Sequence, residues 1–176
     1  MTTWETSLAF VWRPENDGAD NNSAPGEAFL TRWGVTRATW EHARDEGIVD
    51  DKELEDAAKD ELATVQRALF WNVTGCDRLA ARGLPGPALM VFNMAMVSGV
   101  GRGARLLQRV VGVAEDGQVG PLTLAAAQNL HPEDLIAKLE AMDETFFASG
   151  KQAGRFLRGW TRRLRDARIA ALALQA

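Results

Sequence analysis

Apolar residues recur at helical spacing along most of this chain, and no segment shows the sustained two-residue alternation of a half-buried strand. Between residues 54 and 69 the apolar positions follow one another every three or four residues, at Leu54, Ala58, Leu62, Val65 and Leu69. Residues 88–98 are almost wholly apolar, which is typical of a buried helix. The pattern therefore predicts a mainly α fold.

Proline and glycine residues divide the chain into the expected helices. We expect helices over residues 3–13, 36–46, 50–69, 88–98, 102–111, 121–129, 132–149 and 152–174. Asp50 and Glu53 have the spacing of a capping box, which would start one long helix at this point. Residues 84–87, Leu-Pro-Gly-Pro, form the clearest internal boundary. They divide the chain into residues 1–84 and 85–176, which we expect to pack as one compact unit.

The composition excludes several classes of function. The chain has 176 residues, enough for one compact domain or two small units that share a core. A single cysteine, Cys76, excludes an intramolecular disulfide, and with only His42 and His131 beside it the usual zinc sites are excluded. No glycine-rich phosphate-binding motif is present, so we expect no cofactor and no metal. Without a secretory signal or a membrane-spanning apolar run, the sequence predicts a soluble protein of a reducing compartment.

Charge is distributed unevenly, because residues 151–176 carry a net charge of +6 while the whole chain carries −4. Within this segment the apolar residues fall on one helical stripe and the arginines on another: Phe156, Trp160, Leu164, Ala167, Ala171 and Leu174 against Arg155, Arg158, Arg162 and Arg165. A basic amphipathic helix of this kind packs on a core, lies on an anionic membrane or binds nucleic acid. Packing is the default expectation, and the net charge of −4 argues against nucleic acid.

A stretch rich in turn-forming residues, 15–35, follows the first expected helix and predicts a long loop with a short hairpin. Glu15 stands at its start, close in sequence to Trp12 and ahead of Trp33. Burial beside indole rings would raise the pKa of Glu15 and let it act as a general acid. Cleavage of a glycosidic bond needs such an acid and, in most cases, a second carboxylate. The loop holds three further acids, Asp17, Asp20 and Glu27. The alternative is that Glu15 and Asp17 are solvated turn residues.

Two other candidates have structural interpretations. Residues 116–123, Asp-Gly-Gln-Val-Gly-Pro-Leu-Thr, lack the alternating acidic ligands of a calcium loop and predict a tight turn with both glycines at positive φ. Cys76 and His131 could form a thiol nucleophile and its base, but we expect Cys76 to be a small buried residue. His42 lies among charged residues and is expected to be exposed.

Several short motifs follow one another in order along nearly the whole chain. They are Glu15-Asn16-Asp17-Gly18, Ala24-Pro25-Gly26-Glu27, Thr31-Arg32-Trp33-Gly34-Val35-Thr36, Phe70-Trp71, Val97-Ser98-Gly99, Leu107-Gln108, Val111-Gly112, the residues 116–123 and Gly159-Trp160. The series resembles the N-acetylmuramidase endolysins and autolysins of glycoside hydrolase family 108, whose second half is a small peptidoglycan-binding module. The most specific element is Asp-Gly-x-x-Gly-Pro-x-Thr with Leu-Gln upstream.

The resemblance implies a lysozyme-like helical domain with a long N-terminal active-site loop or small hairpin. Residues 1–84 would form its catalytic part and residues 85–176 a peptidoglycan-binding-like part. Glu15 matches the catalytic acid of the family. The second catalytic group does not carry over, because Ala24 stands where the family has an Asp. Three alternatives therefore stay open for it: Glu27, Asp20, or a water held by Thr31.

The same resemblance implies a substrate-binding surface. Trp33, with Trp12 behind it, would form a saccharide platform, and Asn16 and Asp17 would contact the substrate beside Glu15. The activity implied is hydrolysis of the β-1,4 bond between N-acetylmuramic acid and N-acetylglucosamine in peptidoglycan. We expect a monomer that acts on glycan strands, with no nucleic acid as partner.

A phage endolysin is the expected biological role, kept in the host cytoplasm until a separate membrane pore releases it to the periplasm and cell wall. The basic helix at 152–174 would then contact anionic lipid or lipopolysaccharide. One alternative is a lytic transglycosylase, which needs a single Glu. Another is a cell-wall-binding protein without catalytic activity, suggested by the altered loop motifs. A nucleic-acid-binding helical domain is suggested only by the basic tail.

Overall fold

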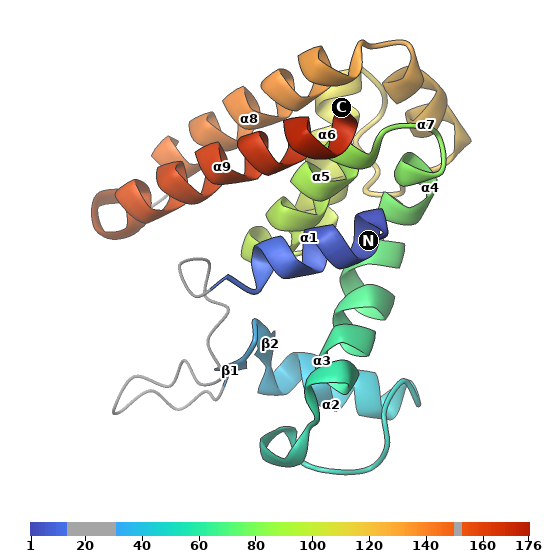
Figure 1. Cartoon of the computed structure of the whole chain (residues 1–176), viewed down its shortest axis with the longest axis vertical. Helices are drawn as coiled ribbons and strands as arrows, with labels where there is room; N and C mark the ends of the chain where they lie inside the picture. The colour runs from blue at the N-terminus through green and yellow to red at the C-terminus, as the bar shows by residue number, and fades with distance from the viewer. Residues whose placement is uncertain (14–30, 150–152) are drawn as a thin grey trace.

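The computed structural model describes residues 1–13, 31–149 and 153–176 (Figure 1). Its α-helices are α1 Thr3–Val11, α2 Arg37–Asp45, α3 Lys59–Gln66, α4 Cys76–Ala80, α5 Pro85–Ser98, α6 Val100–Val111, α7 Pro121–Gln128, α8 Pro132–Ser149 and α9 Ala153–Gln175. A 3-10 turn spans Leu54–Asp56, and a π-helical segment, Arg67–Asn72, continues α3. Two short strands, β1 Thr31–Arg32 and β2 Val35–Thr36, pair antiparallel. The prediction of a mainly α fold is confirmed.

Two hydrophobic cores organise the molecule. The larger core surrounds α5, which contacts α1, α4, α6, α8 and α9 and is buried from Gly86 through Ala95 (Figure 1). The smaller core lies beneath the hairpin and is built around Trp40, Leu54 and Leu62. Trp12, the residue that ends α1, packs against both cores. The predicted division between residues 84 and 85 falls between α4 and α5, which share the larger core.

An aromatic cluster fastens α1 and the π-helical segment to α5. The rings of Trp4, Trp71 and Phe92 lie with centroids 5.5 Å apart in each pair, all in edge-to-face geometry. Such contacts add about 0.5–1.5 kcal/mol per pair beyond area burial. Trp71 is fully buried, so the Phe70-Trp71 motif is a core element of the fold.

The expected long helix from residue 50 is wrong in its first part. Residues 54–56 form a 3-10 turn, and the α-helix begins only at Lys59. The cause is Arg32, whose Nη1 donates to the carbonyl oxygens of Leu54, Glu55 and Ala57 at 3.1, 2.9 and 2.8 Å. Carbonyls held by a guanidinium from the hairpin are not directed along a helix axis.

The expected capping box at Asp50 and Glu53 is also wrong. Glu53 forms ion pairs with Arg37 and Arg44 on α2 instead of capping a helix. The cap belongs to Glu61, whose carboxylate accepts the Ala58 backbone N–H at 2.7 Å. The expected helix that Thr36 caps is confirmed as α2, with the Thr36 hydroxyl accepting from the Thr39 backbone N–H.

The basic C-terminal helix α9 packs on the core, as its apolar stripe predicts. Leu164, Ala167 and Ala171 are buried against α5 and α8. The close approach depends on Gly86, because a Cβ there would lie 2.5 Å from the Ala171 carbonyl oxygen. Arg163 Nε donates to Asn93 Oδ1 at 2.8 Å, which ties α9 to the centre of α5.

Asp143 on α8 is a buried acid. Its side chain is fully buried, and no hydrogen bond from the described part of the chain reaches either carboxyl oxygen. Burial raises the pKa of Asp143 to about 8, because the charged form loses its hydration. The folded state therefore holds a proton here that the unfolded chain releases near pH 4.

Replacing Asp143 with Asn should flatten the pH dependence of stability. Between about pH 4 and pH 8 the folded state binds the extra proton, so wild-type stability should fall as pH rises, by up to about 1.4 kcal/mol per pH unit. Thermal unfolding at pH 5 and pH 8 measures the slope. The exposed neighbour Glu144, changed to Gln, is the matched control. Equal slopes in wild type and Asp143→Asn would contradict this assignment.

Candidate active site

The hairpin presents Trp33 at its tip in an unusual backbone conformation. Thr31 pairs with Thr36 and Arg32 with Val35, which leaves Trp33 and Gly34 as the two-residue turn. Both turn residues have positive φ, 49° and 82°, as hairpin turns of this length require. Glycine adopts this conformation readily, whereas a bulky residue such as tryptophan does so at a cost in strain. Trp33 is held there by the surrounding structure.

Gln66 provides that restraint from α3. Its Nε2 donates to the Trp33 carbonyl oxygen at 2.7 Å, and its Oε1 accepts from Trp12 Nε1 at 2.9 Å. The Gln66 side chain is fully buried, so its amide depends on these two partners for hydrogen bonding. Gly34 leaves room for it, because a Cβ on Gly34 would lie 3.3 Å from Gln66 Nε2. One amide thus joins the end of α1, the hairpin and α3.

Two indole rings and one ammonium group form a continuous surface above Gln66. The Trp12 and Trp33 ring centroids are 5.2 Å apart with an interplanar angle of 51°. Lys59 Nζ lies 3.8 Å from the Trp33 ring centroid and 4.9 Å from that of Trp12, a double cation–π contact. Both indoles are half-buried and Lys59 is exposed. We call Trp12, Trp33 and Lys59 the tryptophan platform.

The platform borders the segment that carries the candidate carboxylates. Glu15, Asn16, Asp17, Asp20 and Glu27 lie outside the described residues, which stop at Arg13 and resume at Thr31. Arg13 follows Trp12 directly, and Thr31 is two residues before Trp33. The residues on either side of the segment therefore adjoin the tryptophan platform in sequence.

Three predicted site residues, Trp12, Trp33 and Thr31, lie within the described part of the chain. Trp12 and Trp33 are brought into ring contact, in agreement with a shared platform. Thr31 is half-buried on β1, opposite Thr36. The roles proposed for these side chains in binding or catalysis stay predictions.

Two site residues were not anticipated from the sequence. Gln66 stands four residues after Leu62, on the apolar face of its helix, and a lone amide on such a face is a signal of a buried hydrogen-bonding role. Lys59 carries no comparable signal, because its position over the rings depends on how α3 meets the hairpin.

The turn at residues 116–123 is structural. Buried Gln108 donates to Asp116 Oδ1 at 2.6 Å and accepts from the Gly117 backbone N–H at 2.8 Å. The Gln108 hydrogen bond is the main cause of a lowered pKa of Asp116. Gly117 has the expected positive φ of 81°, but Gly120 does not: at φ −94° and ψ −172° it is extended, because it precedes α7 as its N-cap.

The cysteine is inert. Cys76 is fully buried, and desolvation raises the pKa of its thiol to about 12. His131 is exposed and pairs with Glu133 at 2.5 Å, so no pairing with the thiol is formed. His42 is exposed, as expected. The described residues contain no group of three or more side chains suited to hold a metal ion, and none of their helices has the length and hydrophobicity needed to cross a membrane.

Paired indoles such as Trp12 and Trp33 are a surface on which a sugar ring can pack. The family comparison agrees: the Glycosyl hydrolase 108 model matches residues 8–99, and the Predicted Peptidoglycan domain matches residues 102–165. The chain belongs to glycosyl hydrolase family 108. The resemblance seen in the motif series is confirmed.

A solved structure supports this assignment. The structure of Brucella abortus SagA matches with a TM-score of 0.82 and 28% sequence identity, covering 98% of this chain and 95% of that one. The expected lysozyme-like helical fold is thereby confirmed. No curated protein matches the chain. The two family matches together make the chain a glycosidase that degrades peptidoglycan.

Replacing Gln66 with Leu should loosen the tryptophan platform. The substitution leaves Trp12 Nε1 and the Trp33 carbonyl without their partner, which should cost about 1–3 kcal/mol in the free energy of unfolding. Chemical denaturation followed by tryptophan fluorescence measures this cost. Gln128→Leu, at an exposed position on α7, is the matched control and should change stability by less than about 0.5 kcal/mol. Equal stabilities of the two variants would contradict the bridging role.

Proposed function

We propose that this chain hydrolyses the β-1,4 bond between N-acetylmuramic acid and N-acetylglucosamine, with Glu15 as the general acid. The family assignment supports a peptidoglycan glycosidase. The position of Glu15, three residues after Trp12, supports its role, because both ends of its segment start from the tryptophan platform.

The platform offers a binding surface for a sugar ring. The apolar C–H face of a pyranose packs on an indole ring, and the half-buried Trp33 at the hairpin tip is the ring that we assign to this contact. Trp12 supports Trp33 from behind, with Gln66 setting the position of both. We assign Asn16 and Asp17, which adjoin Glu15 in sequence, to the polar contacts of the same sugar.

In the proposed reaction Glu15 donates its proton to the glycosidic oxygen as the C–O bond breaks. A second group then serves the opposite face of the sugar, where positive charge develops on the ring. Glu27 and Asp20 are the candidate carboxylates, and a water held by Thr31 is the alternative. A carboxylate nucleophile gives retention of configuration, and an activated water gives inversion.

Replacing Glu15 with Gln should abolish glycan cleavage while leaving the fold intact. Loss of a general acid lowers rates by about 10²–10⁴-fold. Release of reducing ends from purified peptidoglycan measures the activity, with circular dichroism to verify folding. Glu41→Gln, at an exposed position on α2, is the matched control and should retain wild-type activity.

Three other outcomes of the cleavage experiment would contradict parts of this proposal. Full activity in Glu15→Gln would contradict the assignment of the acid and direct attention to Glu27. Anhydro-muramic ends in the products, identified by mass spectrometry, would show a lytic transglycosylase instead of a hydrolase. Sedimentation of the wild type with peptidoglycan without any cleavage would show a wall-binding protein.

We also propose that α9 contacts anionic lipid or lipopolysaccharide through its outer face. Arg162 and Arg165 are exposed there, whereas Arg163 is held by Asn93 and Arg168 pairs with Glu140 at 3.2 Å. Basic residues near an anionic surface contribute about 1 kcal/mol each. The endolysin role, with release from the host cytoplasm, and the monomeric state stay predictions of the family resemblance.

The double substitution Arg162→Gln with Arg165→Gln should weaken binding to vesicles that contain anionic phospholipid by roughly tenfold or more. Co-sedimentation with such vesicles, at low and at high salt, measures the effect. Arg78→Gln on α4 with Arg82→Gln, just after that helix, is the matched control. Point substitutions are preferable to deletion of residues 151–176, because deletion would remove Leu164, Ala167 and Ala171 from the core. Equal vesicle binding by the two double variants would contradict the proposal.

A further inference from the structure

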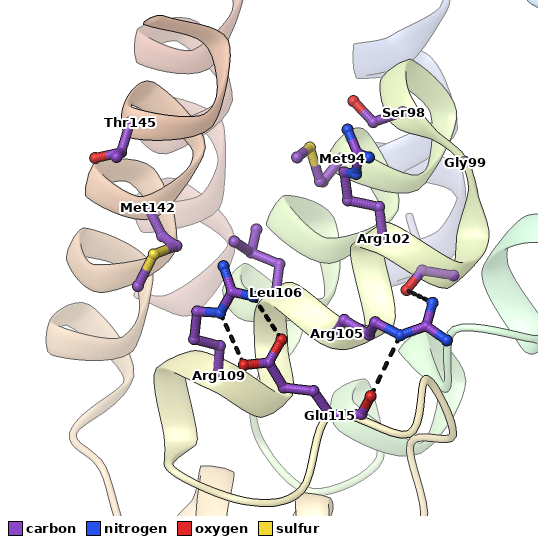
Figure 2. Close-up of a pocket in the computed structure, with 11 residues that line it drawn as sticks. Met94, Ser98, Gly99, Arg102, Arg105, Leu106, Arg109, Glu115, Met142 and Thr145 are labelled. Atoms are coloured by element: carbon purple, nitrogen blue, oxygen red, sulfur yellow. Dashed lines mark hydrogen bonds and ion pairs between the residues drawn. The ribbon is translucent and has the colours of Figure 1, made fainter. Parts of the chain in front are cut away.

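A groove between α6 and α8 lies within the second half of the chain (Figure 2). Its main cavity has a volume of about 630 Å³ and reaches from the end of α5 across α6 to Met142 and Thr145 on α8. A second cavity of about 360 Å³ continues it and shares Arg109, Met142 and Thr145 as lining residues. The main cavity alone has the size of a typical small-molecule site.

The groove is strongly basic in a chain whose net charge is negative. Arg102, Arg105 and Arg109 line it from one face of α6, as their spacing of three and four residues requires, and Lys138 adds a further cation from α8. Glu115 is the sole acid among the described lining residues of the two cavities. We call this surface the arginine groove.

Glu115 pairs with one of these cations, Arg109. It is bound by Arg109 in a two-point ion pair, with Nε to Oε1 at 2.8 Å and Nη2 to Oε2 at 2.7 Å (Figure 2). Arg105 is held by neutral acceptors, the carbonyl oxygens of Gly101 and Glu115, both at 3.2 Å. These two hydrogen bonds fix its guanidinium in place.

Glycines reserve the space for that guanidinium. A Cβ on Gly101 would lie 3.0 Å from Arg105 Nη1, and a Cβ on Gly117 would lie 3.3 Å from Arg105 Cζ. The Arg105 side chain thus lies in a slot between the first turn of α6 and the turn after Glu115. A cation that is positioned in advance loses little conformational freedom on binding an anion.

The chemistry of the groove matches a carboxylate-bearing peptide better than a sugar. No aromatic ring lines either cavity among the described residues, so the groove lacks the stacking surface that the tryptophan platform supplies. It offers guanidinium donors above an apolar floor of Met94, Leu106 and Met142. Guanidinium groups bind carboxylates with two parallel hydrogen bonds, and the apolar floor suits alkyl side chains.

We propose that the arginine groove binds the free carboxylates of the peptidoglycan stem peptide. This inference rests on the proposed function, because it takes peptidoglycan as the substrate and gives the second half of the chain its own contact with it. The groove lies mainly in the stretch matched by the Predicted Peptidoglycan domain, residues 102–165. Glycan on the tryptophan platform and peptide in the arginine groove would then be held by different parts of the chain.

Titration calorimetry with a free stem peptide tests the proposal independently of catalysis. The probe is synthetic L-alanyl-γ-D-glutamyl-meso-diaminopimelyl-D-alanine, and its carboxyl-amidated analogue is the comparison. Wild type and Glu15→Gln should bind the peptide equally, because the probe contains no glycosidic bond. Failure of the proposed glycan cleavage would leave this result unchanged, so the two proposals are distinguishable.

Arg105→Gln and Arg102→Gln should each weaken binding of the peptide by roughly tenfold, since a hydrogen bond to a charged group is worth about 1.5–3 kcal/mol. Arg82→Gln, at an exposed position just after α4, is the matched control and should bind as wild type does. Retained helical circular dichroism verifies that the variants fold.

Three results would overturn the proposal. They are absence of binding by the wild type, equal binding of the amidated peptide, and unchanged affinity in both groove variants. Tighter binding of a short oligonucleotide that displaces the peptide would also overturn it and identify a phosphate-binding surface.

Discussion

The two hydrogen bonds of Gln66 are the interaction on which the candidate site depends. Trp12 and Trp33 come from opposite ends of a long segment, and among the described residues the buried amide of Gln66 hydrogen-bonds to both. A buried amide that lost its partners would be costly, so the bridge is made only when α1, the hairpin and α3 are all in place. The same restraint helps to hold the positive φ of Trp33 and the contact between the two indoles.

The larger core holds α1, and with it Trp12, in a fixed position. The cluster of Trp4, Trp71 and Phe92 fixes α1 on α5, and Trp12 therefore reaches the hairpin from a rigid support. Gln66 is the last residue of α3, and the π-helical segment begins at the next residue. Trp71 in that segment is buried in the larger core, whereas Gln66 contacts the tryptophan platform. π-helical turns within α-helices often occur at functional sites, because the wider turn changes which side chains share a face of the helix.

The tryptophan platform and the arginine groove differ in their chemistry. The tryptophan platform combines indole faces with one ammonium group and borders the acidic segment, whereas the arginine groove concentrates guanidinium groups between α6 and α8. The same distinction holds on α9, where Arg163 serves the fold through Asn93 and Arg162 remains on the surface. Peptidoglycan contains neutral sugars and acidic peptides, and we propose that the tryptophan platform binds the first and the arginine groove the second.

The sequence by itself determined the mainly helical fold, because apolar spacing and the proline and glycine positions are local properties that set helices wherever a core exists to receive them. It also determined the family, through the order of its motifs, and it anticipated the burial of Cys76 and the packing of α9. Tertiary structure decided where α3 begins, because Arg32 from the hairpin takes the carbonyls that an earlier helix start would need. It also decided the roles of Gln66, Lys59 and the arginine groove. Each of these depends on contacts between different elements of the fold. Local sequence patterns predict elements, but they do not predict which elements come into contact.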